Sequence, residues 1–323
     1  MSKITIVDAN KRQCDSWDQF VDNSLNGTIF HKRKFLEYHG DRFKNSERWL
    51  VVLKGEKVIG QINYAVITDL QGIKVALSPY GGSYGGVVLE TLPTFSEANS
   101  IVSTLMEHFR EYELGKIRVT HPISCCAPCS LDVLTFAMFQ HGFKSVNRDI
   151  SSVIRVDQSQ IDEVTSSRAR NMERKSNKAG VKIVSNAPLK DFWLPMQDTF
   201  ARHASESTHT YSQLCNLQER FPGDIWADVA YLKQDPIAGV CYFKLNERVL
   251  SSFYFCQTSV GQQLQSLSAL IMQGLRQAQN RGIYWVDFGT SSTNGIPGPN
   301  IFRFKESFSR EGLFRETLEW SQT

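Results

Sequence analysis

The chain lacks any long hydrophobic run. Its apolar stretches are interrupted within a few residues by Lys, Asp or Gln, whereas a membrane-spanning helix needs about 18 or more consecutive apolar residues. The N-terminal sequence Met1-Ser-Lys-Ile-Thr-Ile-Val-Asp has no apolar segment followed by a small-residue cleavage site, so it does not look like a signal peptide. We therefore expect no membrane span and a cytoplasmic protein.

A strong charge of one sign is also absent. The formal net charge is +3, whereas proteins that bind nucleic acid nonspecifically carry a clustered basic excess. DNA is therefore not an expected partner, and RNA binding is not the default expectation. Hydrophobic residues make up 41% and charged residues 21% of the chain, as in ordinary globular proteins. The 323 residues suit two domains of about 150 residues each.

The cysteines are few and odd in number. Without an export signal, an odd set is most simply interpreted as free thiols in a reducing compartment. Three of them follow His121 in the sequence His-Pro-Ile-Ser-Cys-Cys-Ala-Pro-Cys. Histidine and thiolates are zinc ligands, but this spacing is not a paired Cys-x2-Cys framework, so we expect no metal. The seven cysteines are Cys14, Cys125, Cys126, Cys129, Cys215, Cys241 and Cys256.

One order of secondary structure is predicted twice. In the first half, residues 49–64 have the pattern of two strands joined by a tight turn at Gly55, residues 94–114 that of an amphipathic helix, and residues 116–120 that of a strand. The second half repeats the order, with three strands, a helix and a last strand at residues 226–233, 236–245, 249–256, 266–280 and 283–288. A meander followed by a crossover helix and a strand is an α/β layer. Its recurrence predicts an internal duplication.

The expected domain boundary lies in the polar stretch 157–165, just before a basic helix. It gives an N-terminal domain of residues 1–160 and a C-terminal domain of residues 161–323. Each is expected to be an α/β (α+β) domain, with a mostly antiparallel mixed sheet flanked by helices.

Three motifs lie in order on the second repeat. They are the basic segment Arg170-Asn-Met-Glu-Arg-Lys-Ser-Asn-Lys, the strand end Gly282-Ile-Tyr-Trp-Val-Asp-Phe-Gly and the late segment Ile301-Phe-Arg-Phe-Lys-Glu-Ser-Phe. On the duplicated frame, across residues 20–320, they resemble the tandem-GNAT acyltransferases of the FemABX-like branch, which includes peptidoglycan aminoacyltransferases and BioF2-like acetyltransferase domains. The resemblance implies two tandem GNAT-like domains, with most catalytic motifs in the second.

The same resemblance implies transfer of an acyl group to an amine. The expected donor is acyl-CoA or acetyl-CoA, with aminoacyl-tRNA as the alternative. Ordinary CoA-binding GNAT proteins bind the pyrophosphate with a Gly-rich loop before the crossover helix. Here residues 259–266 contain one glycine, Gly261. This departure leaves the donor open and keeps a third alternative, a non-catalytic GNAT-fold binding protein.

Arg170, Arg174 and Lys178 share one face of a predicted helix because they are four residues apart. As a functional site, the face would bind the phosphates of CoA, tRNA or a nucleotide- or lipid-linked precursor, since guanidinium groups bind phosphate oxygens in pairs. Its structural alternative is a solvated charged surface.

Lys305 lies in an aromatic-rich segment with Phe304, and Asp287 ends a predicted strand. By resemblance, Lys305 would stabilise the oxyanion that develops on the reacting carbonyl, and Phe304 would contact substrate. Asp287 would accept a proton from the attacking amine or orient it. The alternatives are a solvated lysine at a strand edge and an aspartate that caps the following loop.

A polar, titratable loop is predicted between two helices at residues 202–211. Its Glu206, His209 and Tyr211 are candidates for binding the acceptor, with His209 as a base; the alternative is an ordinary exposed loop. Taken together, the sequence predicts N-acylation of an amine, such as an amino sugar, on a surface-polysaccharide or peptidoglycan precursor. A FemABX-type aminoacyl-tRNA-dependent transferase is the alternative enzyme.

Overall fold

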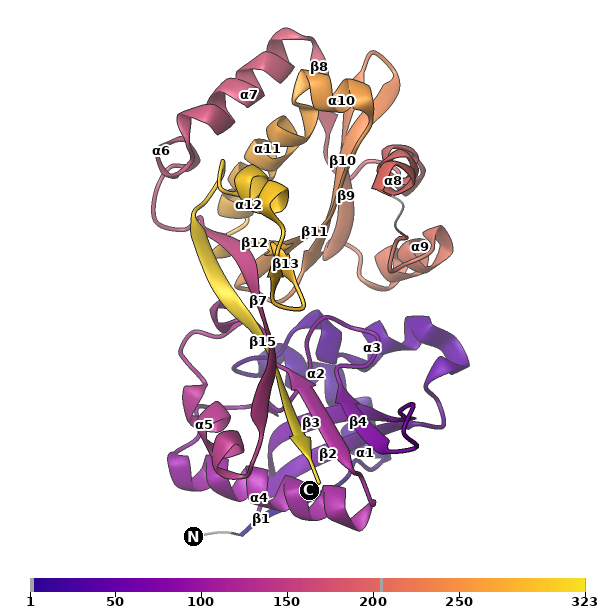
Figure 1. The fold of residues 1–323 in the computed structure, drawn as a ribbon, viewed down its shortest axis with the longest axis vertical. Coiled ribbons are helices and arrows are strands. Elements are labelled where there is room, and N and C mark those ends of the chain that lie inside the picture. Colours follow the sequence, from indigo (N-terminus) through magenta and orange to yellow (C-terminus); the bar gives the residue numbers. More distant parts are fainter. Residues whose placement is uncertain (1–2, 204–205, 323) are drawn as a thin grey trace. The chain divides into compact units, whose positions relative to one another are not determined.

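The first of two structural units is discontinuous in sequence. A computed structural model describes residues 3–203 and 206–322 and is drawn in Figure 1. Unit 1 comprises Met1–Asp149 and Phe314–Thr323, and unit 2 comprises Ile150–Leu313. The chain enters unit 2 within strand β7 (Lys144–Arg155) and returns to unit 1 within strand β15 (Glu311–Ser321).

Unit 1 contains strands in the order β1-β2-β3-β4-β6-β15, with helices before and after the meander. All neighbouring strands are antiparallel except β4 and β6, which are parallel. The elements wholly in unit 1 are β1 (Ile4–Asp8), α1 (Lys11–Asp15), α2 (Trp17–Asn23), η1 (Ile29–His31), α3 (Arg33–Leu36), η2 (Glu37–Arg42), β2 (Glu47–Lys54), β3 (Lys57–Thr68), β4 (Lys74–Ser78), β5 (Val88–Leu89), α4 (Phe95–Glu111), β6 (Lys116–Thr120), η3 (Ser124–Cys126) and α5 (Asp132–Gln140).

The crossover helix α4 begins where its sequence allows a cap. The Thr94 side chain accepts a hydrogen bond from the backbone N–H of Glu97, and the Glu97 side chain accepts one from the backbone N–H of Thr94, a reciprocal capping box. Ile101, Leu105 and Phe109 recur at four-residue spacing and are buried against the sheet. The helix therefore covers one face of the unit 1 sheet, as the periodicity predicted.

Unit 2 has the strand order β8-β9-β10-β11-β12-β7. Only β11 and β12 are parallel. Helices α7, α11 and α12 lie on one side of this sheet and α8 and α9 on the other (Figure 1). The elements wholly in unit 2 are α6 (Ile161–Val164), α7 (Ser167–Lys178), β8 (Val181–Val184), α8 (Leu189–His203), α9 (Tyr211–Arg220), β9 (Ile225–Leu232), β10 (Asp235–Lys244), β11 (Val249–Gln257), α10 (Ser259–Leu264), α11 (Ser266–Asn280), β12 (Trp285–Thr290), β13 (Ser292–Thr293), β14 (Ile296–Pro297) and α12 (Pro299–Lys305).

Close packing of α11 on the sheet depends on a glycine. A Cβ at Gly274 would lie 2.0 Å from the Tyr242 hydroxyl oxygen, so only a glycine lets the helix approach strand β10 this closely. Leu267, Leu270 and Leu275 fill the remaining interface and are almost fully buried.

The predicted α/β fold, with a mostly antiparallel mixed sheet flanked by helices, is confirmed. The order β2-β3-β4-α4-β6 in unit 1 recurs as β9-β10-β11-α11-β12 in unit 2. The unit boundaries differ from the predicted domains 1–160 and 161–323. Residues 150–160 belong to unit 2, and the C-terminal residues 314–323, expected in the second domain, belong to unit 1.

Candidate functional site

Strands β11 and β12 separate part-way along their length. They pair in parallel only from Val249 opposite Trp285 to Ser251 opposite Asp287, although β11 continues beside β10 to Gln257. A β-bulge explains the separation: Ser252 lies opposite Tyr242 and Tyr254 opposite Cys241, which leaves Phe253 as the extra residue. A bulge bends its strand and increases its twist. The carboxyl ends of adjacent parallel strands are a common place for ligands in α/β sheets.

Asp287 is buried at this point of separation. Its Oδ1 accepts hydrogen bonds from Ser151 Oγ (2.5 Å) and from the backbone N–H of Gly289 (2.8 Å), and its Oδ2 accepts one from Ser251 Oγ (3.2 Å). The side chain is 3% exposed. Three donors hold the carboxylate in place, and the bond from the Gly289 N–H fixes the turn at that residue. Its role as a proton acceptor stays a prediction.

Lys305, the last residue of α12, points its ammonium group at the same turn. Its Nζ donates to the carbonyl oxygens of Gly289 and Thr290, both at 2.7 Å. These bonds use two of three N–H groups, and within residues 3–203 and 206–322 no further acceptor bonds to Nζ. The side chain is 5% exposed, and burial lowers the pKa of Lys305 to about 8, against an opposing effect of the Asp287 charge.

A cluster of phenylalanines fixes α12. Pro299 occupies the first turn of the helix, where its missing N–H costs nothing. Phe304 packs on Phe308 with ring centroids 5.4 Å apart and on Phe255 of β11 at 6.4 Å. The lysine-bearing segment is thus a helix, not the strand edge considered from sequence. Phe304 is half-buried in this cluster, and its contact with substrate stays a prediction.

The basic helix α7 is tied to the segment that follows α12. Ser166, its N-cap residue, donates through Oγ to the carbonyl oxygen of Ser307 (2.5 Å). Arg170 donates to the carbonyl oxygens of Asp162 (2.6 Å) and Thr165, so its guanidinium group partly serves the turn before the helix.

Arg174 and Lys178 present their charges to solvent. Both are exposed, and in the described part of the chain neither has a carboxylate within 4.0 Å. The one acidic residue of α7, Glu173, instead pairs with Arg276 of α11 (2.6 Å). The three sequence motifs therefore meet in unit 2 through α7, β12 and α12, and two of the three predicted basic residues remain available to an anion.

His209 lies against the bulged strand. Its Nδ1 is 2.6 Å from the Tyr254 hydroxyl oxygen, and its backbone N–H donates to the same oxygen (3.2 Å). Because Tyr254 and the Asp287 partner Ser251 are three residues apart on β11, His209 and Asp287 contact the same stretch of strand. The side chain of His209 is 2% exposed.

The other two residues predicted in this loop are exposed. Tyr211 begins α9 and packs on Trp193 of α8, with ring centroids 5.4 Å apart. Glu206 is exposed, and residues 204–205 of the same loop lie outside the described residues. The loop does connect two helices, as expected, and among residues 206–211 only His209 is buried.

The single glycine before α11 has a packing role. A Cβ at Gly261 would lie 2.2 Å from the carbonyl oxygen of Ile237, so the glycine allows α10 to approach β10. Its backbone N–H is already bonded to the Thr258 side chain (3.1 Å). This stretch therefore does not supply the cradle of backbone N–H groups that a Gly-rich pyrophosphate loop provides.

In unit 1, a loop bonds to the ends of the parallel strands β4 and β6, the counterparts of β11 and β12. Beyond Ser78, the loop before β5 returns to the sheet: Gly85 N–H donates to the Thr120 carbonyl oxygen (2.8 Å) and Gly86 N–H to Ser78 Oγ (2.8 Å). Gly81-Gly82-Ser83-Tyr84-Gly85 in this loop has the Gly-x-Ser-x-Gly spacing of hydrolase nucleophiles. That motif requires a turn from strand directly into helix, whereas this one leads to strand β5.

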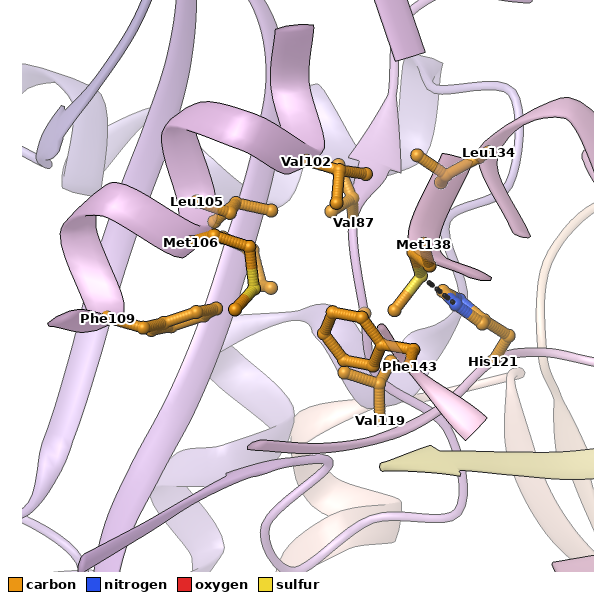
Figure 2. A pocket seen from close by; sticks show the side chains of 12 residues that line it. Val87, Val102, Leu105, Met106, Phe109, Val119, His121, Leu134, Met138 and Phe143 are labelled. Carbon is orange, nitrogen blue, oxygen red and sulfur yellow. Dashed lines mark hydrogen bonds between the residues drawn. The ribbon is translucent and has the colours of Figure 1, made fainter. Parts of the chain in front are cut away.

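Unit 1 contains a small cavity (Figure 2). Its cavity volume is about 20 Å³, whereas ligand pockets have volumes on the order of 300 Å³ or more. His121 points at Met138, with Nε2 3.3 Å from Sδ, and burial lowers its pKa to about 4. The lining residues are Ile62, Gly86, Val87, Val102, Leu105, Met106, Phe109, Val119, His121, Leu134, Met138 and Phe143. A neutral histidine in so small an apolar space does not make a substrate site.

The structure adds serines that the sequence analysis missed. Ser151 and Ser251 hold Asp287, and Ser152 Oγ lies 2.7 Å from Ser291 Oγ. A signal was present: Ser-Ser interrupts the apolar runs of two strands, at residues 151–152 and 251–252. Buried serines of this kind need partners, and here they find them around β12.

Comparison with known proteins defines the fold. No family model and no curated protein matches the chain. Among solved structures, FemX superposes with a TM-score of 0.73 at 12% identity, over 98% of this chain and 97% of that chain. The C-terminal domain of a putative lysylphosphatidylglycerol synthetase from Agrobacterium fabrum gives 0.62 at 10% identity, over 97% and 93%. A tandem GNAT protein from the clavulanic acid biosynthesis pathway gives 0.54 at 10%, over 99% and 98%.

These similarities establish that the chain has the tandem-GNAT fold of FemX-like proteins, as the sequence resemblance predicted. At 10–12% identity they concern the fold alone. In the described ranges no three His, Cys, Asp or Glu side chains are grouped as metal ligands would be. No helix within those ranges combines the length and apolar character needed to cross a membrane. All seven cysteines are free thiols.

Proposed function

We propose that the protein is an N-acyltransferase whose reaction centre is the separation of β11 and β12 in unit 2. The observation that carries the proposal is the buried ammonium group of Lys305, which has two N–H groups bonded to carbonyl oxygens of one turn. A positive charge that is already desolvated and oriented needs no rearrangement to stabilise an oxyanion. The third N–H group is the one that would donate to it.

The reaction follows from this arrangement. A neutral amine of the acceptor attacks the carbonyl carbon of the activated acyl group, and a C–N bond forms while the carbonyl oxygen becomes an oxyanion. Lys305 stabilises that oxyanion. When the tetrahedral species collapses, the C–S or C–O bond to the donor breaks, the amine nitrogen loses a proton, and the leaving thiolate or alkoxide takes one up. Holding the two substrates in line supplies a large part of such a rate enhancement.

We assign different roles to Asp287 and His209. Because the Asp287 carboxylate already accepts three hydrogen bonds, we infer that it positions the Gly289 turn on which Lys305 rests. His209 is the proposed proton acceptor, since histidine is the side chain most often used as a general base. Tyr254, which contacts Nδ1, would orient the ring.

The proposed acceptor is an amine on a cell-surface polysaccharide or peptidoglycan precursor, such as an amino sugar. This part rests on the sequence resemblance and on the fold shared with FemX. Arg174 and Lys178, exposed on α7, are proposed to bind phosphates of the donor or of a nucleotide- or lipid-linked acceptor. Glu206, Tyr211 and Phe304 stay proposed acceptor contacts.

Acyl-CoA is the first donor to test and aminoacyl-tRNA the second. The packing role of Gly261 favours aminoacyl-tRNA. In a CoA-binding protein the glycines before the crossover helix bind the pyrophosphate, whereas here the one glycine serves packing. Acyl transfer from labelled acetyl-CoA, longer acyl-CoAs and charged tRNA should be measured with amino-sugar nucleotides and peptidoglycan precursors as acceptors.

Substitution of Lys305 tests the site within that assay. Lys305→Ala should lower kcat by about 100-fold or more, the effect typical of losing one oxyanion donor, whereas Lys305→Arg should retain part of the rate because it keeps the charge. Lys233, exposed in the β9–β10 turn, provides the control Lys233→Ala, for which we expect no change. Near-normal turnover of Lys305→Ala at saturating substrates would refute the assigned role. Failure of every donor and acceptor to bind would favour a non-catalytic protein.

A further inference from the structure

Unit 1 carries an exposed apolar surface at the start of α4 and along α5. Phe95 of α4 and Phe136 of α5 lie together, with ring centroids 5.9 Å apart, and half of each side chain is exposed. The members of this α4–α5 patch and their exposed fractions are Leu92 (50%), Phe95 (50%), Val133 (38%), Phe136 (52%) and Phe139 (38%). Scattered exposed apolar residues are ordinary, but a contiguous group of large ones marks an interaction site.

Helix α5 is apolar on its outer side as well as on its inner side. Leu134, Ala137 and Met138 are buried against unit 1, so they already account for the contact of the helix with its own sheet. Val133, Phe136 and Phe139 recur at three-residue spacing on the outer side. A helix that is hydrophobic all round is normally covered on both sides, and only one side of α5 is covered within unit 1.

The charges near the patch decide between classes of partner. Within α5 and the first two turns of α4, the charged residues are Asp132 and Glu97. Glu97 is paired with Lys54 at 2.7 Å. A surface that docks on an anionic membrane carries lysines and arginines beside its apolar residues. These two helical segments contain no lysine or arginine, so the patch suits another apolar surface, such as itself.

The size of the patch fits one half of a symmetric interface. With about 150–250 Å² for a whole aromatic side chain and less for Leu92 and Val133, the exposed fractions of the five residues amount to about 400 Å² of apolar surface. A stable interface buries about 800 Å² per partner, a little over half of it apolar. Aromatic residues are the ones enriched at the centre of such interfaces.

We propose that the α4–α5 patch is the interface of a homodimer in which it meets the same patch of a second copy of this chain. Self-association of one surface gives a closed twofold dimer, with Phe136 near its centre. This inference is independent of the acyltransferase proposal, since none of the five residues belongs to the site in unit 2.

Sedimentation equilibrium of the full chain tests the proposal. The wild-type protein should show a monomer–dimer equilibrium, and Phe136→Ser should raise its dissociation constant at least tenfold, because truncating a central aromatic residue typically costs that much. The double variant Phe95→Ser/Phe136→Ser should be monomeric. Leu70→Ser, at a fully exposed leucine outside the patch, is the matched control and should dimerise like the wild type.

Two further measurements keep the result interpretable. Circular dichroism and thermal unfolding should show that the serine variants remain folded, as expected for substitutions of half-exposed side chains. Flotation with phosphatidylcholine vesicles and with vesicles containing phosphatidylglycerol should show no binding that depends on Phe136. A wild-type protein that stays monomeric at every concentration, a dimer unaffected by the patch substitutions, or patch-dependent vesicle binding would each overturn the proposal.

Discussion

At Lys305, burial and a neighbouring carboxylate act on the same ammonium group in opposite directions. Burial lowers its pKa to about 8, and the Asp287 charge raises it. The protonated form is the one proposed to stabilise the oxyanion, so activity should fall as the pH rises through about 8. We predict a descending limb there in the pH profile of kcat/KM. Lys305→Arg should abolish that limb, because a guanidinium stays charged. A wild-type profile that is flat to pH 10 would argue against the assignment.

A second residue-level prediction separates the charge of Asp287 from its hydrogen bonds. Asp287→Asn keeps an oxygen for the Gly289 N–H but removes the negative charge that raises the pKa of Lys305. The descending limb should therefore move to lower pH, while the protein stays folded. Ser251→Ala, which removes one hydrogen bond of Asp287 and no charge, is the matched control and should leave the limb in place. Equal profiles for the wild type and Asp287→Asn would contradict the coupling.

Asp228 is a buried carboxylate outside the proposed site. Its Oδ1 accepts from the Asn186 N–H (3.0 Å), whereas Oδ2 has no hydrogen-bond partner among the described residues. Burial raises its pKa from 3.8 to about 6. Between these values the folded state holds a proton that the unfolded state has lost, so this group makes the free energy of unfolding fall as the pH rises from about 4 to 6.

Replacing that carboxylate should stabilise the protein at neutral pH. Asp228→Asn keeps an acceptor for Asn186 and removes the charge, so we expect a gain of about 1–3 kcal/mol in the free energy of unfolding at pH 7.5, from about 1.4 kcal/mol per unit of pKa shift. At pH 4 the gain should nearly vanish, because Asp228 is then protonated in the folded state. Urea denaturation at the two pH values measures it; an equal difference at both would mean that charge burial is not the cause.

At the scale of elements, the basic residues of helix α7 divide between a structural role and a proposed role in binding phosphate. Arg170 is engaged by carbonyl oxygens at the start of the helix, while Arg174 and Lys178 are exposed. Arg174→Glu/Lys178→Glu should weaken binding of a phosphate-bearing donor or acceptor about tenfold at low salt. The difference should shrink at high salt, because exposed charges are screened. Lys190→Glu, at an exposed lysine of α8, is the control. Unchanged affinity in the α7 variant would leave the helix a solvated surface.

Helices and strands whose pattern lies within one segment were predictable from the sequence. The contacts that their side chains make with distant segments were harder to predict. The periodicity of residues 266–280 predicted α11 at its observed bounds, and residues 116–120 were predicted as β6, because both patterns are set within one segment. The segment around Lys305 was harder: its phenylalanines suit a strand edge equally well, and only their packing on Phe255 and Phe288 selects a helix. The residues that hold Asp287 come from two distant strands, which no local pattern could join.

At the scale of the whole molecule, the chain leaves unit 1, forms unit 2 and then returns to unit 1 for its last residues. The C-terminal part of β15 pairs with β6 of unit 1, with Leu318 opposite Val119. Leu318 is fully buried in the unit 1 core, although it follows all of unit 2 in the sequence. Unit 1 therefore cannot complete its sheet until the chain has passed through unit 2.

Two leucines of equal burial distinguish this arrangement from the predicted boundary at residue 160. Leu318→Ala and Leu270→Ala both remove a fully buried side chain, which typically costs about 2–5 kcal/mol, one from unit 1 and one from the α11 side of unit 2. Hydrogen exchange should rise in β6 and α4 for Leu318→Ala, and in β10 and α11 for Leu270→Ala. If Leu318→Ala instead loosened the amides of unit 2 and spared β6, the C-terminal strand would belong to the second domain, as the sequence alone suggested. The expected pattern follows from where the side chain is buried, because local unfolding begins in the unit whose core has lost contacts.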